Sequence, residues 1–359
     1  MKNWFLFAGL LLALPGFSQN IVGGLERRPA RNGSPRPLEN YPNSTVEYGT
    51  LTITPGQPLR TIVTKSRQRT GRQPAVLLIQ WLSCSTVEVQ QPTDGVDLLV
   101  RHLAGHPDVL FMRVEKPGVG DSQGDCAACD LHTEMAMNRA ALAALKQRPD
   151  VDTNRIILLG ISLGASLSPL VGQGQNIRGY LVTGGCTETW FEHMMGLERR
   201  RLALTGETPA QINAKMARFA TLYQRYYIEK MTPGDVERQL PHLRGIWYDQ
   251  PDRQYGRPAA FYHQVQDLNF EAGWASVRVP TLIVYGEYDW IMTRSDHQKI
   301  ADIVNANRSG LAQLHVLPKA DHSLGIYASP KDAFDGKNPQ IPTTLTPLVD
   351  AWLRKLLIE

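Results

Sequence analysis

Short apolar runs alternate with amphipathic segments along most of the chain. A run of consecutive apolar residues is typical of a strand buried on both faces, whereas apolar residues three or four positions apart indicate a helix. Alternating strands and helices predict an α/β fold, with a mostly parallel sheet covered by helices on both faces. The predicted strands occupy residues 75–80, 109–114, 155–159, 179–183, 281–285 and 311–317, and the predicted helices occupy 95–103, 130–145 and 345–356.

Two stretches depart from this alternation. Residues 46–53 and 60–65 are β-rich on either side of a Pro-Gly turn, which predicts a hairpin ahead of the parallel strands. Residues 188–273 hold several helical patterns and no convincing strand, so we predict a helical cap insertion over the C-terminal edge of the sheet, within one domain at 45–359. The cap's aromatic residues could line an apolar pocket or form its core, and we favour the core for most of Trp190, Phe191, Trp247, Tyr248, Phe261, Tyr262 and Trp274.

The first residues have the pattern of a secretory signal peptide. Lys2 precedes an apolar stretch at residues 4–14, followed by Pro15 and small residues. That stretch is shorter than the roughly 20 residues that a membrane-spanning helix needs. We predict a signal peptide at 1–19, an extended lead-in at 20–44, and a secreted or periplasmic protein without a membrane span after cleavage. An uncleaved membrane anchor is the alternative.

Length and charge narrow the classes of function. The 359 residues are enough for a large core, and 38 basic against 34 acidic side chains leave a formal net charge of +4. Because this excess is small and dispersed, it gives no indication of nucleic-acid binding. The basic residues 199–201 are interpreted as a solvated helix face. The expected partner is a small-molecule or short-peptide substrate, and the sequence does not determine the oligomeric state.

Four cysteines would meet an oxidising compartment if the chain is exported. Such cysteines usually pair, so we predict at least one disulfide bond. The Cys126-x-x-Cys129 spacing is also that of half a zinc site, and a site completed by Cys84 and Cys186 is the alternative.

The strongest chemical signal is the sequence GISLG at residues 160–164, directly behind a predicted strand. A strand that ends in G-x-S-x-G predicts a sharp turn into a helix, because a Cβ at either glycine would collide with the neighbouring strand or helix. Such a turn presents the hydroxyl of Ser162 to a base. Alone, the pattern also occurs in ordinary loops.

Two acid–base candidates follow the serine, each just beyond the end of a predicted strand. They are Asp289 and His322. The carboxyl ends of parallel strands converge on one crevice, so residues far apart in sequence can meet there. An imidazole can take the proton of a serine hydroxyl during attack, and a carboxylate holds the ring in the required tautomer. Glu287 and Asp321 are the rival acids, and the spacing from Gly286 favours Asp289.

Taken together, these motifs resemble those of the α/β-hydrolase superfamily over about residues 46–359. The resemblance is carried by GISLG at 160–164, GEYD at 286–289 and ADH at 320–322. The KPGVGDS loop at 116–122 is similar to the family's Gly-rich loop after its fourth strand. More narrowly, the chain is similar to exported bacterial serine hydrolases of the esterase and serine-aminopeptidase-like branches.

The resemblance implies an α/β-hydrolase fold with a catalytic triad of Ser162, His322 and Asp289, and no metal or organic cofactor.

The resemblance also implies an oxyanion hole made of two backbone N–H groups. One belongs to Leu163, and the other to Leu82 or Trp81. Here the chain departs from the family, because Gln80-Trp81-Leu82 stands where many members have His-Gly and a variable residue.

In this fold the four cysteines lie at the active-site edge of the sheet. The resemblance implies a disulfide bond from Cys84 to Cys126 or Cys129, joining the loops that frame the oxyanion hole, with Cys186 nearby.

The sequence thus predicts an exported serine hydrolase that cleaves an ester, thioester or amide through an acyl-enzyme. An acyltransferase with the same triad and a non-catalytic binding protein on the hydrolase scaffold are the alternatives. The motifs specify the fold and the triad, but hardly the substrate.

Overall fold

The structure, a computed structural model, describes residues 39–358. The predicted signal peptide at 1–19 and most of the lead-in at 20–44 lie outside the described residues. Within residues 39–358, no helix has the length and apolar character needed to cross a membrane.

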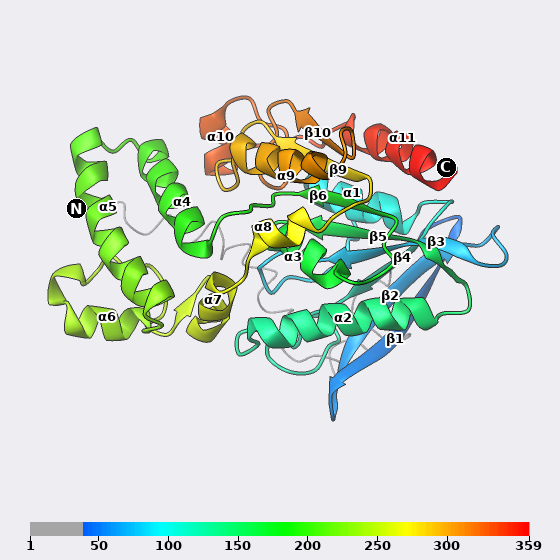
Figure 1. Ribbon diagram of the computed structural model, residues 1–359, viewed down its shortest axis with the longest axis horizontal. Coiled ribbons are helices and arrows are strands. Elements are labelled where there is room, and N and C mark those ends of the chain that lie inside the picture. Colours follow the sequence, from blue (N-terminus) through cyan, green and yellow to red (C-terminus); the bar gives the residue numbers. More distant parts are fainter. Residues whose placement is uncertain (1–38, 359) are drawn as a thin grey trace.

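An eight-stranded sheet organises this part of the chain, in the order β1-β2-β4-β3-β5-β6-β9-β10 (Figure 1). The predicted hairpin is β1 (Ser44–Thr54) and β2 (Gln57–Ser66), and β2 also runs antiparallel to β4. The other neighbouring strands are parallel, which confirms the predicted fold class. They are β3 (Gln73–Ile79), β4 (Leu110–Val114), β5 (Val151–Ile161), β6 (Gly179–Thr183), β9 (Thr281–Gly286) and β10 (Ala312–Leu317).

Helices cover both faces of the sheet, because successive strand side chains point to opposite faces and both sets are apolar. Leu77 and Leu158 pack in a core with α2 (Leu131–Gln147), α3 (Leu163–Gly172) and α9 (Arg294–Asn307). Val76 and Ile157 point the other way, into a core with α1 (Gly95–Ala104) and α11 (Leu345–Ile358). A short helix, α10 (Pro330–Asp335), precedes α11.

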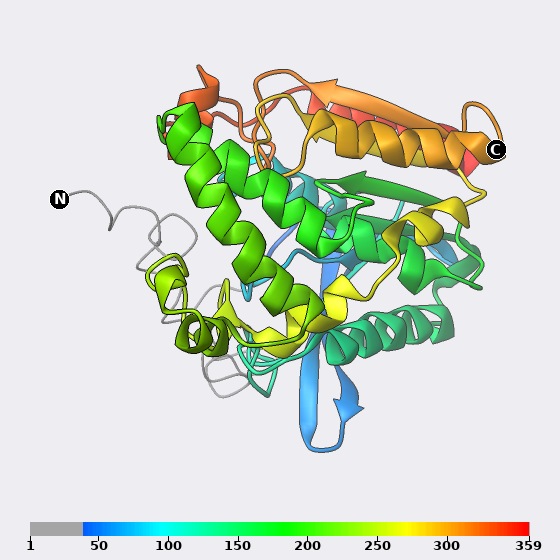
Figure 2. The same cartoon turned by 60° about the vertical axis from the view of Figure 1, so that its left-hand side comes forward.

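The chain between β6 and β9 is mostly helical; it extends to one side of the sheet in Figure 1 and comes to the front in Figure 2. Two strands of two residues each, β7 (Arg253–Gln254) and β8 (Arg257–Pro258), pair within it, against the expectation of no strand. They are too short to leave a periodic pattern in the sequence. The helices are α4 (Trp190–Leu204), α5 (Pro209–Tyr223), the π-helix η3 (Gln224–Ile228), α6 (Pro233–Gln239), the 3-10 helix η4 (Pro241–Leu243), α7 (Ala259–Gln266) and α8 (Phe270–Ala275).

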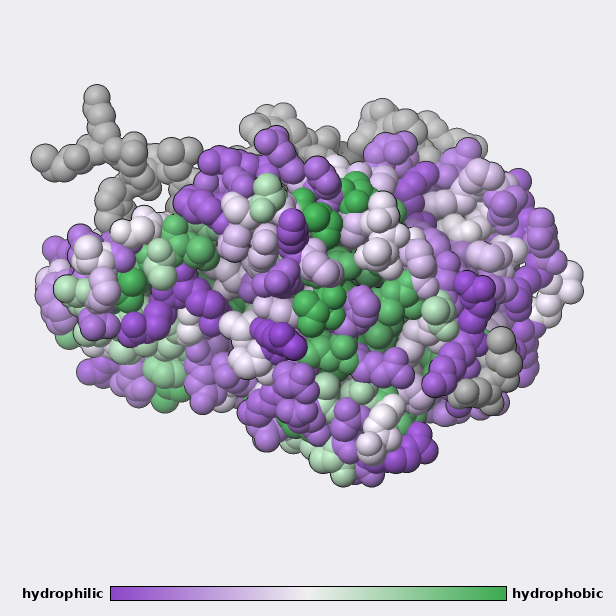
Figure 3. All heavy atoms as spheres, turned by 90° about the horizontal axis from the view of Figure 1, so that it is seen from above, coloured by the Kyte–Doolittle hydropathy of each residue, from purple (hydrophilic) through white to green (hydrophobic). Residues whose placement is uncertain are grey.

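Four of the seven aromatic residues singled out in this segment are buried, and they share one core with the sheet: Trp274 packs against Tyr180 of β6. Trp190, Phe261, Tyr262 and Trp274 are all buried, whereas Tyr248 is 38% exposed. Seen from above in Figure 3, the surface is largely hydrophilic, with a group of hydrophobic residues in its middle. That the segment acts as a cap stays a prediction.

Candidate active site

The serine of the GISLG motif lies at a sharp turn between β5 and α3. Ser162 has φ 56° and ψ −126°, a conformation that costs a non-glycine residue about 1–3 kcal/mol. A Cβ on Gly160 would lie 2.3 Å from Ser168 Oγ, and one on Gly164 would lie 2.1 Å from Ile79 O. Close packing therefore requires glycine on both sides of the serine.

The loops after β9 and β10 bring Asp289 and His322 to this serine. Nε2 of His322 lies 2.9 Å from Ser162 Oγ, and Nδ1 lies 2.8 Å from Asp289 Oδ2. The other carboxylate oxygen, Oδ1, accepts the N–H groups of Ile291 and Met292 at 2.8 and 2.9 Å. These bonds fix the carboxylate so that Oδ2 faces the imidazole.

The carboxylate also sets the protonation behaviour of His322. Burial lowers the pKa of the imidazole, but attraction and hydrogen bonding to Asp289 outweigh burial and hold the pKa above its ordinary value of 6.5. When Nδ1–H donates to Asp289, the neutral ring keeps a lone pair on Nε2 for the serine hydroxyl. The arrangement can therefore perform general-base catalysis on that hydroxyl.

The two rival acids are occupied elsewhere. Glu287 Oε2 accepts the N–H of Lys319 at 2.8 Å. Asp321 Oδ1 accepts two N–H groups of its own loop, at 3.0 and 2.9 Å. Among the three candidates, the structure brings Asp289 to the imidazole.

Gly184, at the end of β6, lies against the imidazole. It has φ +69°, and a Cβ there would come within 2.7 Å of His322 Cε1. Its N–H donates to Nε2 of the buried His297 at 3.0 Å, and Nδ1 of His297 donates to Thr293 O at 2.8 Å. His297 thus fixes the backbone that borders His322.

The predicted oxyanion donors lie on two segments. Leu163 is the first residue of α3, and Leu82 lies in the loop after β3. Within residues 39–358, neither backbone N–H has an acceptor. The carbonyls of Trp81 and Leu82 both accept hydrogen bonds from Nζ of Lys116, the second at 3.1 Å.

Cys84 and Cys126 form a disulfide bond between the loop after β3 and the loop after β4. This confirms a bond from Cys84 to one member of the Cys126-x-x-Cys129 pair. Cys129 and Cys186 are free and buried. Because the bond uses two sulfurs that the zinc alternative needed, the four-cysteine zinc site is wrong.

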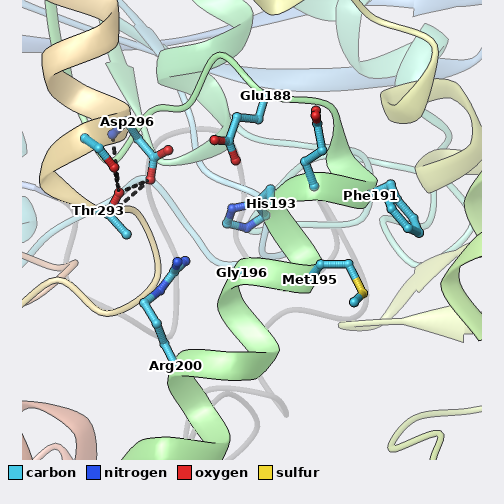
Figure 4. A pocket seen from close by; sticks show the side chains of 10 residues that line it. Glu188, Phe191, His193, Met195, Gly196, Arg200, Thr293 and Asp296 are labelled. Carbon is cyan, nitrogen blue, oxygen red and sulfur yellow. Dashed lines mark hydrogen bonds between the residues drawn. The ribbon is translucent and has the colours of Figure 1, made fainter. Parts of the chain in front are cut away.

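A cavity of about 570 Å³ lies between α4 and the start of α9 (Figure 4). Arg200, on its wall, donates to the carbonyls of Trp290 and Ile291 at 2.7 and 2.8 Å, so the cavity adjoins the loop that carries Asp289. The interpretation of residues 199–201 as a solvated face is therefore wrong for Arg200. It is also wrong for Arg201, which pairs with the buried carboxylate of Glu198 at 2.6 Å, whereas Arg199 is exposed. The lining residues are Glu188, Phe191, Glu192, His193, Met195, Gly196, Arg200, Thr293, Ser295 and Asp296.

His193 is an uncharged imidazole in this cavity. Burial, and then the positive charges of Arg200 and His322, lower its pKa to about 3. It therefore remains neutral throughout the physiological pH range.

One group in the described residues has metal-ligand character, formed by His102 of α1, His106 just beyond the end of α1, and Asp350 of α11. Asp350 Oδ1 lies 2.6 Å from His102 Nε2 and 3.3 Å from His106 Nε2. Nδ1 of His106 accepts the N–H of Asp108 at 3.1 Å, so in the neutral ring the proton lies on Nε2, facing the carboxylate. The group is thus a hydrogen-bonded link from α11 to the end of α1 and the turn that follows it.

Comparison with known proteins places this fold in a family. The model of the Alpha/beta hydrolase family matches residues 90–335. The chain belongs to the alpha/beta hydrolase family. Among curated proteins, none matches the sequence.

Several solved alpha/beta-fold enzymes have a similar structure. Est1E from Butyrivibrio proteoclasticus with bound ferulic acid has a TM-score of 0.55 at 14% identity, over 87% of this chain and 100% of that chain. Acetyl xylan esterase 1 from Thermoanaerobacterium sp. has a TM-score of 0.50 at 12% identity, over 89% and 86% of the two chains. An esterase from Pyrococcus furiosus has a TM-score of 0.50 at 12% identity, over 90% and 96%. At these identities the likeness concerns the fold alone.

Sequence reasoning missed several residues that surround the site of this alpha/beta hydrolase: Lys116, His193, Arg200, Arg257 and His297. Lys116 had a local signal, since a cation two residues after a buried strand needs a partner. Arg257 had no such signal in the sequence, because its partners come from distant segments of the chain.

Proposed function

We propose that the protein is a serine hydrolase that cleaves a carboxylic ester, thioester or amide through an acyl-enzyme. Membership of the alpha/beta hydrolase family supports hydrolysis. The observation that carries the serine mechanism is one imidazole within hydrogen-bond distance of both Ser162 Oγ and Asp289 Oδ2, at 2.9 and 2.8 Å.

The geometry supports the following steps. Ser162 Oγ attacks the substrate carbonyl carbon while Nε2 of His322 takes the hydroxyl proton. Asp289 stabilises the resulting imidazolium, and the N–H groups of Leu163 and Leu82 bind the oxygen that becomes negative. The carbonyl reforms as the bond to the leaving group breaks, and the leaving group takes the proton from Nε2. Water then attacks the acyl-enzyme by the same route and releases the acid.

An ester is the substrate class to test first. The structurally similar proteins include esterases, one with ferulic acid bound. The cavity beside Asp289 presents Phe191 and Met195 together with charged side chains, which suits a substrate with one apolar and one polar part.

Export is part of the proposal. The apolar segment near Lys2 supports a signal peptide at residues 1–19. The Cys84–Cys126 bond supports an oxidising compartment, because disulfides are rare in the cytosol.

Replacing the nucleophile tests the mechanism. Ser162→Ala should lower kcat by about 10⁶-fold, as in other serine triads, and should abolish labelling by a fluorophosphonate. The assay is a series of p-nitrophenyl esters of increasing acyl length beside aminoacyl p-nitroanilides. Ser276→Ala, an exposed serine at the end of α8, is the control and should keep full activity.

Other outcomes identify the alternatives. A wild-type protein that resists the fluorophosphonate and turns over no substrate would be a binding protein. A product that becomes an ester of an added alcohol, in preference to the free acid, would identify an acyltransferase.

A further inference from the structure

A buried lysine holds the loop in which the second oxyanion donor is expected. Nζ of Lys116 donates to the carbonyl oxygens of Trp81 and Leu82. The side chain of Lys116 is fully buried and lies 3.0 Å from the equally buried carboxylate of Glu134. Taking such charges out of water is expensive, so their placement beside this loop calls for a reason.

The order of the strands places Lys116 and Ser162 on opposite sides of this loop. β3 lies between β4 and β5 in the sheet. Lys116 follows β4, Ser162 follows β5, and the loop in question follows β3. The carbonyls of Trp81 and Leu82 therefore point toward the β4 side.

Peptide geometry then fixes the direction of one N–H group. The described residues contain no cis peptide bond, and in a trans peptide the N–H points opposite to the C=O of the same group. Because the carbonyl of Trp81 points to Lys116, the N–H of Leu82 points to the β5 side, where Ser162 lies. That N–H has no acceptor within residues 39–358.

The same reasoning disfavours Trp81 as the donor. A Cβ on Gly164 would lie 2.5 Å from Gln80 O, so this carbonyl faces the first turn of α3. The N–H of Trp81 belongs to the same peptide group as that carbonyl and therefore points away from the helix.

Lys116 is itself held by an ionic network. Arg257 of β8 donates to Glu134 Oε2 at 2.6 Å, and both side chains are fully buried. Nη1 of Arg257 also lies 2.9 Å from Cys126 Sγ of the disulfide. Burial, opposed by Glu134, lowers the pKa of Lys116 to about 8, so the ammonium form still predominates at neutral pH.

We propose that Lys116 is a positioning residue of the oxyanion hole, which holds the peptide group between Trp81 and Leu82 so that the Leu82 N–H faces the oxygen of the tetrahedral intermediate. The cation also polarises this peptide group, which makes its N–H a stronger donor. This inference rests on the proposed serine hydrolase function. The proposal also concerns the loop in which Trp81 stands where many members of the family have glycine.

Three variants test the role: Lys116→Met, Lys116→Arg and, as a control, Lys65→Met. Lys65 makes ion pairs with Glu47 and Asp150 at 2.7 Å each, and it lies on β2, away from the loop. The readouts are kcat and KM per active site, counted by fluorophosphonate titration, and the affinity for a boronic acid that forms a tetrahedral adduct with the serine.

We expect Lys116→Met to lower kcat per active site by about 10-fold to 100-fold, less than complete loss of an oxyanion donor, with little change in KM. The affinity for the boronic acid should fall by a similar factor. Lys116→Arg should retain more of both, because its guanidinium still donates to carbonyls, and Lys65→Met should match the wild type.

Unchanged kcat and boronic acid affinity per active site in Lys116→Met, with only a lower melting temperature, would overturn the proposal. If Lys116→Met does not fold, Glu134→Gln replaces it, because it removes the charge that holds Lys116 and keeps the side-chain shape. It should lower kcat and boronic acid affinity in the same direction, and wild-type values would overturn the proposal. If the wild type is inert to the fluorophosphonate, the proposed serine hydrolase function itself is refuted. If only the Lys116 variants lose kcat, the serine hydrolase function stands and the role of Lys116 is supported.

Discussion

Asp289 acts on His322 in two ways, through orientation and through charge. The carboxylate binds Nδ1 at 2.8 Å, and its negative charge outweighs the burial that lowers the imidazole pKa. The pKa of His322 is therefore held above 6.5, and the neutral base form predominates only at pH values above that pKa. Replacing the carboxylate by an amide removes the charge and also changes the hydrogen bond at Nδ1, and the two effects are read from different measurements: kcat for the orientation and the pH midpoint for the charge.

Asp289→Asn should lower kcat by about 10⁴-fold, because the amide stabilises the wrong tautomer of the imidazole. In the wild type, kcat/KM should rise with pH through a midpoint above 6.5, and in the variant this midpoint should shift downward. The measurement is kcat/KM for a neutral ester from pH 5 to 9. Glu287→Gln is the matched control, and an unshifted midpoint in Asp289→Asn would argue against the electrostatic role.

The loop that carries His322 packs against the start of α1. The N–H of Val96 donates to Ser323 O at 2.9 Å, and a Cβ on Gly95 would lie 2.4 Å from Leu324 O. Asp94 caps the helix by accepting the N–H of Asp97 at 2.8 Å. Burial, and then the charge of Asp97, raise the pKa of Asp94 to about 7.

A raised carboxyl pKa in the folded state means that folding favours the protonated form. Wild-type stability should therefore fall as pH rises from about 4 to about 7, since the unfolded chain ionises first. Asp94→Asn keeps the helix cap and has no proton to lose. At pH 8 it should raise the free energy of unfolding by about 1–2 kcal/mol, less than the full shift implies because some solvent contact remains.

Urea unfolding at pH 8 and pH 4 measures this difference. The gain should be present at pH 8 and absent at pH 4. If Asp94→Asn raised the free energy of unfolding equally at both pH values, the cause would be packing and not the ionisation of Asp94.

Elements with a local signature were predictable from the sequence. The strands are marked in the sequence by apolar runs, and the turn at residues 160–164 is marked by its glycines. Both patterns are readable because these structures form between residues close in the chain. The strands β7 and β8 were too short for a pattern. The contacts of Lys116 with Trp81 and of Arg257 with Glu134 join residues 35 and 123 positions apart, so only the folded chain brings them together.

Across the whole molecule, the disulfide and Arg257 join three regions. The bond connects the loops after β3 and β4, and Arg257 connects both to the helical segment between β6 and β9. The network therefore links the loop of the expected oxyanion donor to the segment predicted to act as a cap.

Removing the bond should destabilise the fold. The Cys84→Ser and Cys126→Ser double variant should lose about 2–4 kcal/mol of unfolding free energy, the usual contribution of a disulfide. Denaturant unfolding measures the loss, and reduced wild type should resemble the variant. Thiol titration of the unfolded, unreduced wild type should find Cys129 and Cys186 alone; four free thiols would contradict the bond.

The hydrogen bond between His322 and Ser162 joins residues 160 positions apart, and it has a consequence for how the protein is made. The turn that carries the serine is synthesised long before the histidine that takes its proton in the proposed mechanism. In that mechanism, a growing chain holds no paired serine and imidazole until β10 has joined the edge of the sheet. Under the proposed mechanism, the order of synthesis alone thus keeps the unfinished chain inert.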